Sequence, residues 1–106
     1  VWQPHTFSRT MALEEDYIRA LDMADKVLVL KIYSAREENP GYSAKKIAQA
    51  LTEEKAQYCS DFDTAMEVLL ANLRKDDVVI VFSAGDATYV SQTLHKALKQ
   101  GSASYE

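Results

Sequence analysis

The chain has 106 residues, of which 47% are hydrophobic and 26% are charged, and its formal net charge is −4. This length suits one domain with a single core, and the acidic balance gives no electrostatic support for binding nucleic acid. The longest apolar run, residues 78–82, is too short to cross a bilayer, so we expect no membrane partner either. The single cysteine, Cys59, can form no internal disulfide, which fits a reducing, cytoplasmic compartment.

The first residues predict the end of a buried strand. Val1-Trp2-Gln3 leads into Pro4, which cannot donate a hydrogen bond to a strand ladder. The chain opens with no methionine, no polar lead-in and no cap, so we expect a fragment that lacks the element before Val1. Ser8 or Thr10 is expected to cap the next helix. The apolar residues of that helix recur at three- and four-residue spacing: Leu13, Tyr17, Ala20, Leu21 and Ala24.

Strands and helices alternate along the rest of the chain. The expected strands are residues 26–33, 56–59 and 78–82, and the expected helices are residues 44–52, 64–75 and 88–99. Ser43 should cap the first of these helices, and Asp61 or Asp63 the second. The five consecutive apolar residues 78–82 should be buried on both faces. Gly101 should end the last helix, and residues 102–106 should form a frayed tail.

This alternation predicts the fold class. Short connections between strands and helices imply right-handed crossovers and a mostly parallel sheet with helices on both faces. We therefore expect an α/β chain, a Rossmann-like three-layer sandwich that is truncated at its N-terminus.

Ligands of open α/β sheets bind beyond the carboxyl ends of the strands. That rule selects three turns, residues 4–10, 33–41 and 83–88. The first turn concentrates polar side chains: His5, Thr6, Ser8, Arg9 and Thr10. A cation such as Arg9 is unfavourable near a helix N-terminus unless an anion lies between them. Arg9 and the helix N–H groups are therefore candidates to bind a carboxylate or phosphate, although a solvated arginine and a histidine that only caps or packs remain the alternative.

The other two turns offer fewer candidates. Arg36 could reach the same crevice from the second turn, whereas Glu37 and Glu38 are expected to be solvated. The third turn contributes Ser83, Gly85 and Asp86, where a glycine permits a positive φ or a close backbone approach. It lacks the GxGxxG spacing of dinucleotide sites, and the chain has no GxxxxGK[ST] loop for triphosphates. We expect no metal site, because Asp61 and Asp63 have no further ligand at a suitable spacing, and His95 and Cys59 are isolated.

Three stretches resemble the Mur ligase family of peptidoglycan synthesis. Residues 3–10, QPHTFSRT, resemble a family signature at the end of a strand in the third domain. Residues 32–37, IYSARE, and residues 83–86, SAGD, resemble two later segments in the right order. The resemblance covers essentially the whole chain, residues 1–106, and is closest to the members that join L-alanine to UDP-N-acetylmuramate. Two positions depart from the pattern: Thr6 stands where many members have arginine, and Ser83 where they usually have glycine.

The resemblance implies an ATP-dependent amide ligase of the bacterial cytoplasm. Its substrates would be L-alanine and UDP-N-acetylmuramate, joined through an acyl phosphate, with ATP and Mg²⁺ bound mainly by other Mur ligase domains in cis. This C-terminal domain would close over the site and hold the amino acid, and alone it should be inactive. The resemblance implies no catalytic residue here, and these substrate-binding residues: His5, Thr6, Ser8, Arg9, Arg36, Ser83, Gly85 and Asp86. The alternatives are a recycling ligase that attaches a ready-made peptide, and a non-catalytic stand-alone α/β binding module.

Overall fold

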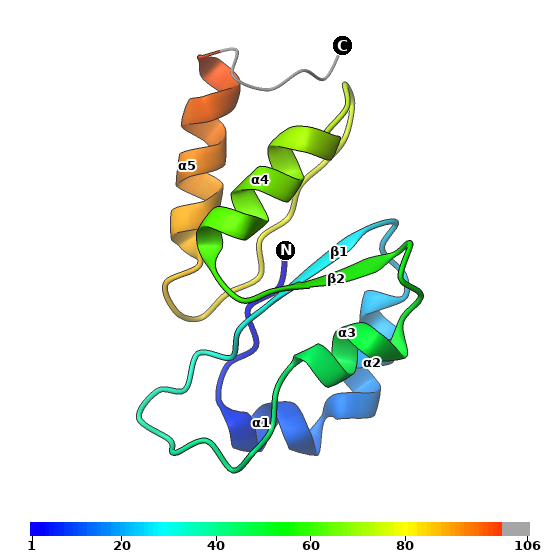
Figure 1. The fold of residues 1–106 in the computed structure, drawn as a ribbon, viewed down its shortest axis with the longest axis vertical. Helices are drawn as coiled ribbons and strands as arrows, with labels where there is room; N and C mark the ends of the chain where they lie inside the picture. Colours follow the sequence, from blue (N-terminus) through cyan, green and yellow to red (C-terminus); the bar gives the residue numbers. More distant parts are fainter. Residues whose placement is uncertain (101–106) are drawn as a thin grey trace.

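A parallel pair of short strands forms the centre of the fold (Figure 1). The computed structural model describes residues 1–100. Strands β1 (Val27–Leu30) and β2 (Ala56–Cys59) pair with Val27 beside Ala56 and Leu30 beside Cys59. All four residues of β1 are buried, as expected for a strand covered on both faces.

The pairing continues sideways through Trp2, which forms parallel bridges with Val29 and with Phe82. The Trp2 N–H donates to the Leu28 carbonyl (2.9 Å), and the Phe82 N–H donates to the Val1 carbonyl (2.8 Å). Four extended segments therefore lie in the spatial order 56–59, 27–30, 1–3 and 78–82. Only the first two form a continuous ladder, so the structure is a mixed α/β fold with a small parallel sheet.

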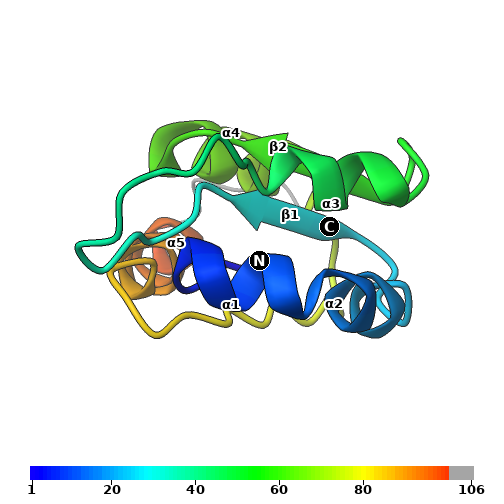
Figure 2. The same ribbon diagram turned by 90° about the horizontal axis from the view of Figure 1, so that it is seen from below.

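Helices cover both faces of this sheet (Figures 1 and 2). Val27 and Val29 of β1 face one core cluster, which includes Ile47, and Leu28 and Leu30 face the other, which includes Val90. None of the helices within residues 1–100 is long and apolar enough to cross a membrane. The first face carries α1 (Phe7–Ala12), α2 (Glu14–Leu21) and α3 (Lys45–Ala50), and the second carries α4 (Phe62–Asn72) and α5 (Thr88–Lys99).

The expected first helix is two helices. The backbone of Leu13 (φ −110°, ψ 17°) leaves the helical conformation and separates α1 from α2. The cap of α1 is Thr6, whose hydroxyl accepts a hydrogen bond from the Arg9 N–H (3.3 Å), so the expectation of Ser8 or Thr10 as the cap is wrong. The first helix therefore begins at Phe7, before either of the expected caps.

One of the two other expected caps is confirmed. Asp61 caps α4 by accepting from the Thr64 N–H (2.7 Å), which decides between Asp61 and Asp63. The N-cap of α3 is Ala44, which makes no side-chain capping hydrogen bond, so the expectation of Ser43 as the cap is wrong. The Ser43 hydroxyl accepts from the Lys45 N–H (3.2 Å) one residue before the cap, and α3 is shorter than expected. The expectations for Gly101 and residues 102–106 lie outside the described residues.

Residues 78–82 are not buried on both faces, so that expectation is wrong. Val79 and Val81 pack toward α4 and α5, whereas Val78 and Phe82 are 83% and 61% exposed. The reason is that the helices described on the first face cover β1 and Trp2 but leave the neighbouring segment open. The apolar run therefore has the alternating burial of a strand covered on one side.

Candidate functional site

The first two turns run side by side at the carboxyl edge of the sheet. His5 and Tyr33 form a parallel bridge, in which the Thr6 N–H donates to the Tyr33 carbonyl (2.8 Å) and the Tyr33 N–H to the Pro4 carbonyl (2.9 Å). The His5 and Tyr33 rings stack with centroids 5.7 Å apart and an interplanar angle of 14°. The Nδ1 atom of His5 is buried and has no hydrogen-bond partner among the described residues.

Gln3 ties the third turn to the same edge. Its side chain is buried, and its Nε2 donates to Asp86 Oδ1 (2.7 Å). Its Oε1 accepts from the Ser83 hydroxyl (2.6 Å) and from the Ala87 N–H (3.4 Å). Sequence reasoning placed Gln3 in the strand and missed this function. The available signal was an amide side chain at the end of an otherwise apolar strand.

Gly85 approaches the second turn so closely that a side chain does not fit. A β-carbon at this position would lie 2.7 Å from the Tyr33 ring and 2.9 Å from Gln3 Oε1. The φ of Gly85 is not positive, so close approach is the reason for glycine here rather than a left-handed backbone. Ser83 also acts within the turn, because its hydroxyl accepts from the Gly85 N–H (3.0 Å).

An open cleft of about 410 Å³ lies at the carboxyl ends of β1 and β2. Of the residues expected to bind substrate, only Asp86 lines it. Burial raises the pKa of the Cys59 thiol in its wall, with a smaller contribution from Asp61, which keeps this cysteine an unreactive apolar group. The polar lining residues are Gln3, Lys31, Tyr33, Ser34, Ser60, Asp61 and Asp86.

A carboxylate from the second turn occupies the start of α1. Glu37 Oε1 accepts from the N–H groups of Phe7 (2.6 Å) and Ser8 (3.2 Å), and Oε2 accepts from the Ser8 hydroxyl (2.5 Å). We call these three hydrogen bonds the Glu37 clasp. The bonds from Ser8 lower the pKa of Glu37, with smaller contributions from the Phe7 N–H and the charge of His5. The expectation that Glu37 is simply solvated is therefore wrong, and the anion at this helix start belongs to the protein itself.

The two arginines of these turns remain available. Both Arg9 and Arg36 are exposed, and neither guanidinium forms a hydrogen bond or an ion pair with another residue in the 1–100 range. The backbone around them is strained, because Thr6, Ala35 and Arg36 have φ values of 64°, 51° and 77°. Strain of this kind tends to gather at functional sites, where the surrounding structure holds it in place.

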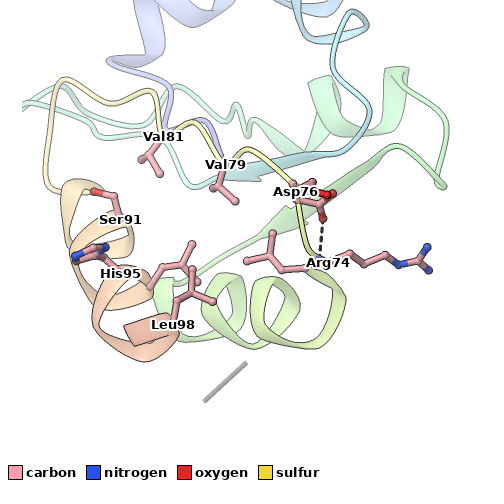
Figure 3. Close-up of a pocket in the computed structure, with 10 residues that line it drawn as sticks. Arg74, Asp76, Val79, Val81, Ser91, His95 and Leu98 are labelled. Atoms are coloured by element: carbon pink, nitrogen blue, oxygen red, sulfur yellow. Dashed lines mark hydrogen bonds between the residues drawn. The ribbon is translucent and has the colours of Figure 1, made fainter. Parts of the chain in front are cut away.

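A second cavity, of about 390 Å³, lies between residues 78–82 and helices α4 and α5 (Figure 3). Val79 and Val81 point into it from the sheet, and Leu98 faces them from α5. Of the candidate functional residues considered from sequence, only His95 lines it, and none of the expected substrate-binding residues does. Within residues 1–100 no group of three or more His, Cys, Asp or Glu side chains is placed to hold a metal ion.

Comparison with known proteins identifies the family. Residues 3–85 match the family described as "Mur ligase, glutamate ligase domain". The chain belongs to the Mur ligase family. Mur ligases are ATP-dependent amide ligases, and this match, to their C-terminal domain, runs from Gln3, just before the first turn, to Gly85 in the third. It confirms the resemblance seen in the three sequence stretches.

Three similar Mur ligases carry the name UDP-N-acetylmuramate–L-alanine ligase. The protein of Lachnoclostridium phytofermentans is 40% identical over 89% of this chain, and that of Rhodococcus erythropolis is 40% identical over 93%. The protein of Thermobifida fusca is 36% identical over 92% of this chain. The chain spans only 20–21% of the length of these relatives.

Proposed function

We propose that this chain is the amino-acid-binding, closing domain of a ligase that joins L-alanine to UDP-N-acetylmuramate. The names of the similar Mur ligases support this substrate pair. The parallel order of the extended segments, with helices on both faces, supports a Rossmann-like three-layer sandwich for the domain.

The observation that carries the proposal is the exposed Arg9, whose guanidinium pairs with no other residue in the range 1–100 and which lies beside a helix start that the Glu37 clasp already satisfies. The Glu37 clasp occupies the first N–H groups of α1, so these groups are not free for a substrate anion. The guanidinium of Arg9 is then the group that can bind the carboxylate of alanine, with two parallel N–H···O bonds. The proposal also assigns Arg36, His5 and the third turn, with Ser83, Gly85 and Asp86, to the wall of this amino-acid site.

In this reaction the carboxyl group of muramate is first phosphorylated to an acyl phosphate, and the amine of alanine then attacks the acyl carbon and expels phosphate. This domain would position the alanine, because binding of the alanine carboxylate fixes the alanine amine relative to the acyl phosphate. Closure of the domain excludes water that would otherwise hydrolyse the acyl phosphate. ATP and Mg²⁺ would bind mainly on other domains in cis, which fits the lack of a GxxxxGK[ST] loop in this sequence, and this chain alone should be inactive.

The test is Arg9→Ala in the longer protein that contains this chain. A charge-assisted hydrogen bond contributes about 1.5–3 kcal/mol, so the KM for alanine should rise roughly 10- to 100-fold while the KM for ATP stays nearly constant. Arg19→Ala is the matched control, because Arg19 is an exposed arginine of α2 paired with Asp16. If Arg9→Ala and Arg19→Ala leave the same alanine dependence, the role given to Arg9 is wrong.

A further inference from the structure

The Glu37 clasp connects two segments that each carry an exposed arginine, and neither arginine pairs through its guanidinium with any residue that the structure describes. Ser8, which gives two of the three hydrogen bonds, directly precedes Arg9 in α1. Glu37 directly follows Arg36 in the second turn. Glu37 therefore links the backbone next to Arg36 to the backbone next to Arg9. Its partner Ser8 lies 29 positions away in the sequence.

The second turn is built to present this carboxylate. Ala35 and Arg36 both have positive φ, and the Glu37 N–H returns to the Ser34 carbonyl (3.0 Å) in a tight turn. A left-handed backbone at two consecutive residues that are not glycine is costly, and it persists only where other contacts hold it. The hydrogen bonds to Glu37 are short and involve a charge, so they can supply that restraint.

We propose that Glu37 is a positioning residue that holds Arg9 and Arg36 at a fixed spacing for one carboxylate-bearing substrate. This inference rests on the proposed function, in which that substrate is the incoming amino acid. In this proposal Glu37 acts on α1 and not on the substrate, because its hydrogen bonds go to Phe7 and Ser8. Its effect passes through the two arginines. A residue that served only to cap α1 would change stability but not the affinity for the amino acid.

The chain provides a closely matched control in Glu38, which is exposed and makes no hydrogen bond to any described residue. In the longer protein, Glu37→Ala should raise the KM for alanine by about tenfold or more, because small misplacements of binding groups have large effects. Glu37→Gln keeps an oxygen acceptor at nearly the same place and should recover part of this loss. Glu38→Ala should leave the KM for alanine unchanged, and all three variants should keep the KM for ATP within about twofold of the wild-type value.

Amide hydrogen exchange on the same protein tests the clasp independently of ligase activity. Glu37→Ala should speed exchange at Phe7 and Ser8, whereas Glu38→Ala should not. Faster exchange together with a raised KM for alanine supports the proposal. If exchange is faster but Glu37→Ala lowers only kcat, or changes nothing, while Arg9→Ala still raises the KM for alanine, the positioning role is overturned and the proposed function stands. If Arg9→Ala also leaves that KM unchanged, the amino-acid role of the first turn fails as well.

Discussion

Gly85 lies against the ring of Tyr33, so that a β-carbon on Gly85 would come within 2.7 Å of two ring atoms. This contact presses the third turn against the second, and Tyr33 is itself stacked on His5 of the first turn. A single point of close packing therefore joins all three turns at the carboxyl edge of the sheet.

Gly85→Ala should force the Tyr33 ring and the third turn apart. Overpacking of this kind costs about 1–3 kcal/mol, so the free energy of unfolding should fall by that amount in urea denaturation. The same substitution in a Tyr33→Ala background should cost much less, because the ring is gone. An equal cost in both backgrounds would show that the contact with Tyr33 is not the reason for glycine at this position.

Asp86 should matter to stability as a hydrogen-bond acceptor more than as a charge. Asp86→Ala leaves the buried Gln3 amide without its acceptor and should lower the free energy of unfolding by about 1–3 kcal/mol. Asp86→Asn retains an oxygen at the Oδ1 position and should cost clearly less. The two variants can be compared by urea denaturation at neutral pH, and a larger loss for Asp86→Asn than for Asp86→Ala would contradict this account.

Glu37 should make stability depend on pH on the acid side. Its pKa in the folded chain is lowered from the ordinary value of 4.5, chiefly by Ser8, and the facing charge of His5 acts in the same direction. The stabilisation is therefore complete above pH 4.5 and is lost as the pH falls from there through the lower folded-state pKa. The difference in unfolding free energy between wild type and Glu37→Gln should shrink over that range.

The control for this pH dependence is Asp61, the cap of α4, whose pKa is lowered mainly by hydrogen bonds from Thr64. Asp61→Asn should remove the contribution of Asp61 to the pH dependence of the unfolding free energy and leave the contribution of Glu37 unchanged. If the difference in unfolding free energy between wild type and Glu37→Gln stays constant from pH 7 to pH 3, protonation of Glu37 does not contribute to the pH dependence of stability.

Local patterns predicted much of the architecture. The apolar run around β1, the cap at Asp61 and the helix Thr88–Lys99 all follow from short-range spacing. The rule that ligands bind beyond the carboxyl ends of parallel strands selected three turns, and the structure brings these turns together.

The features that sequence reasoning missed depend on residues far apart in the chain. Glu37 meets Phe7 across 30 positions, and Gln3 meets Asp86 across 83, so no local spacing contains either pair. The apolar spacing showed neither the break at Leu13 nor the cap of α1 at Thr6, a residue whose positive φ its side chain does not favour. The exposure of Val78 depends on which helices cover the neighbouring segments, which the apolar run itself cannot show.

The most direct measurement of the central claim uses the longer protein with ATP, Mg²⁺ and UDP-N-acetylmuramate. Phosphate release is followed with L-alanine, with other amino acids, or with a ready-made peptide as the acceptor. We predict that phosphate release depends on L-alanine and is accompanied by formation of the amide. In the Arg9→Ala variant, the same release should require much higher alanine concentrations. Release that requires the peptide and ignores alanine would instead assign this domain to a recycling ligase and contradict the account.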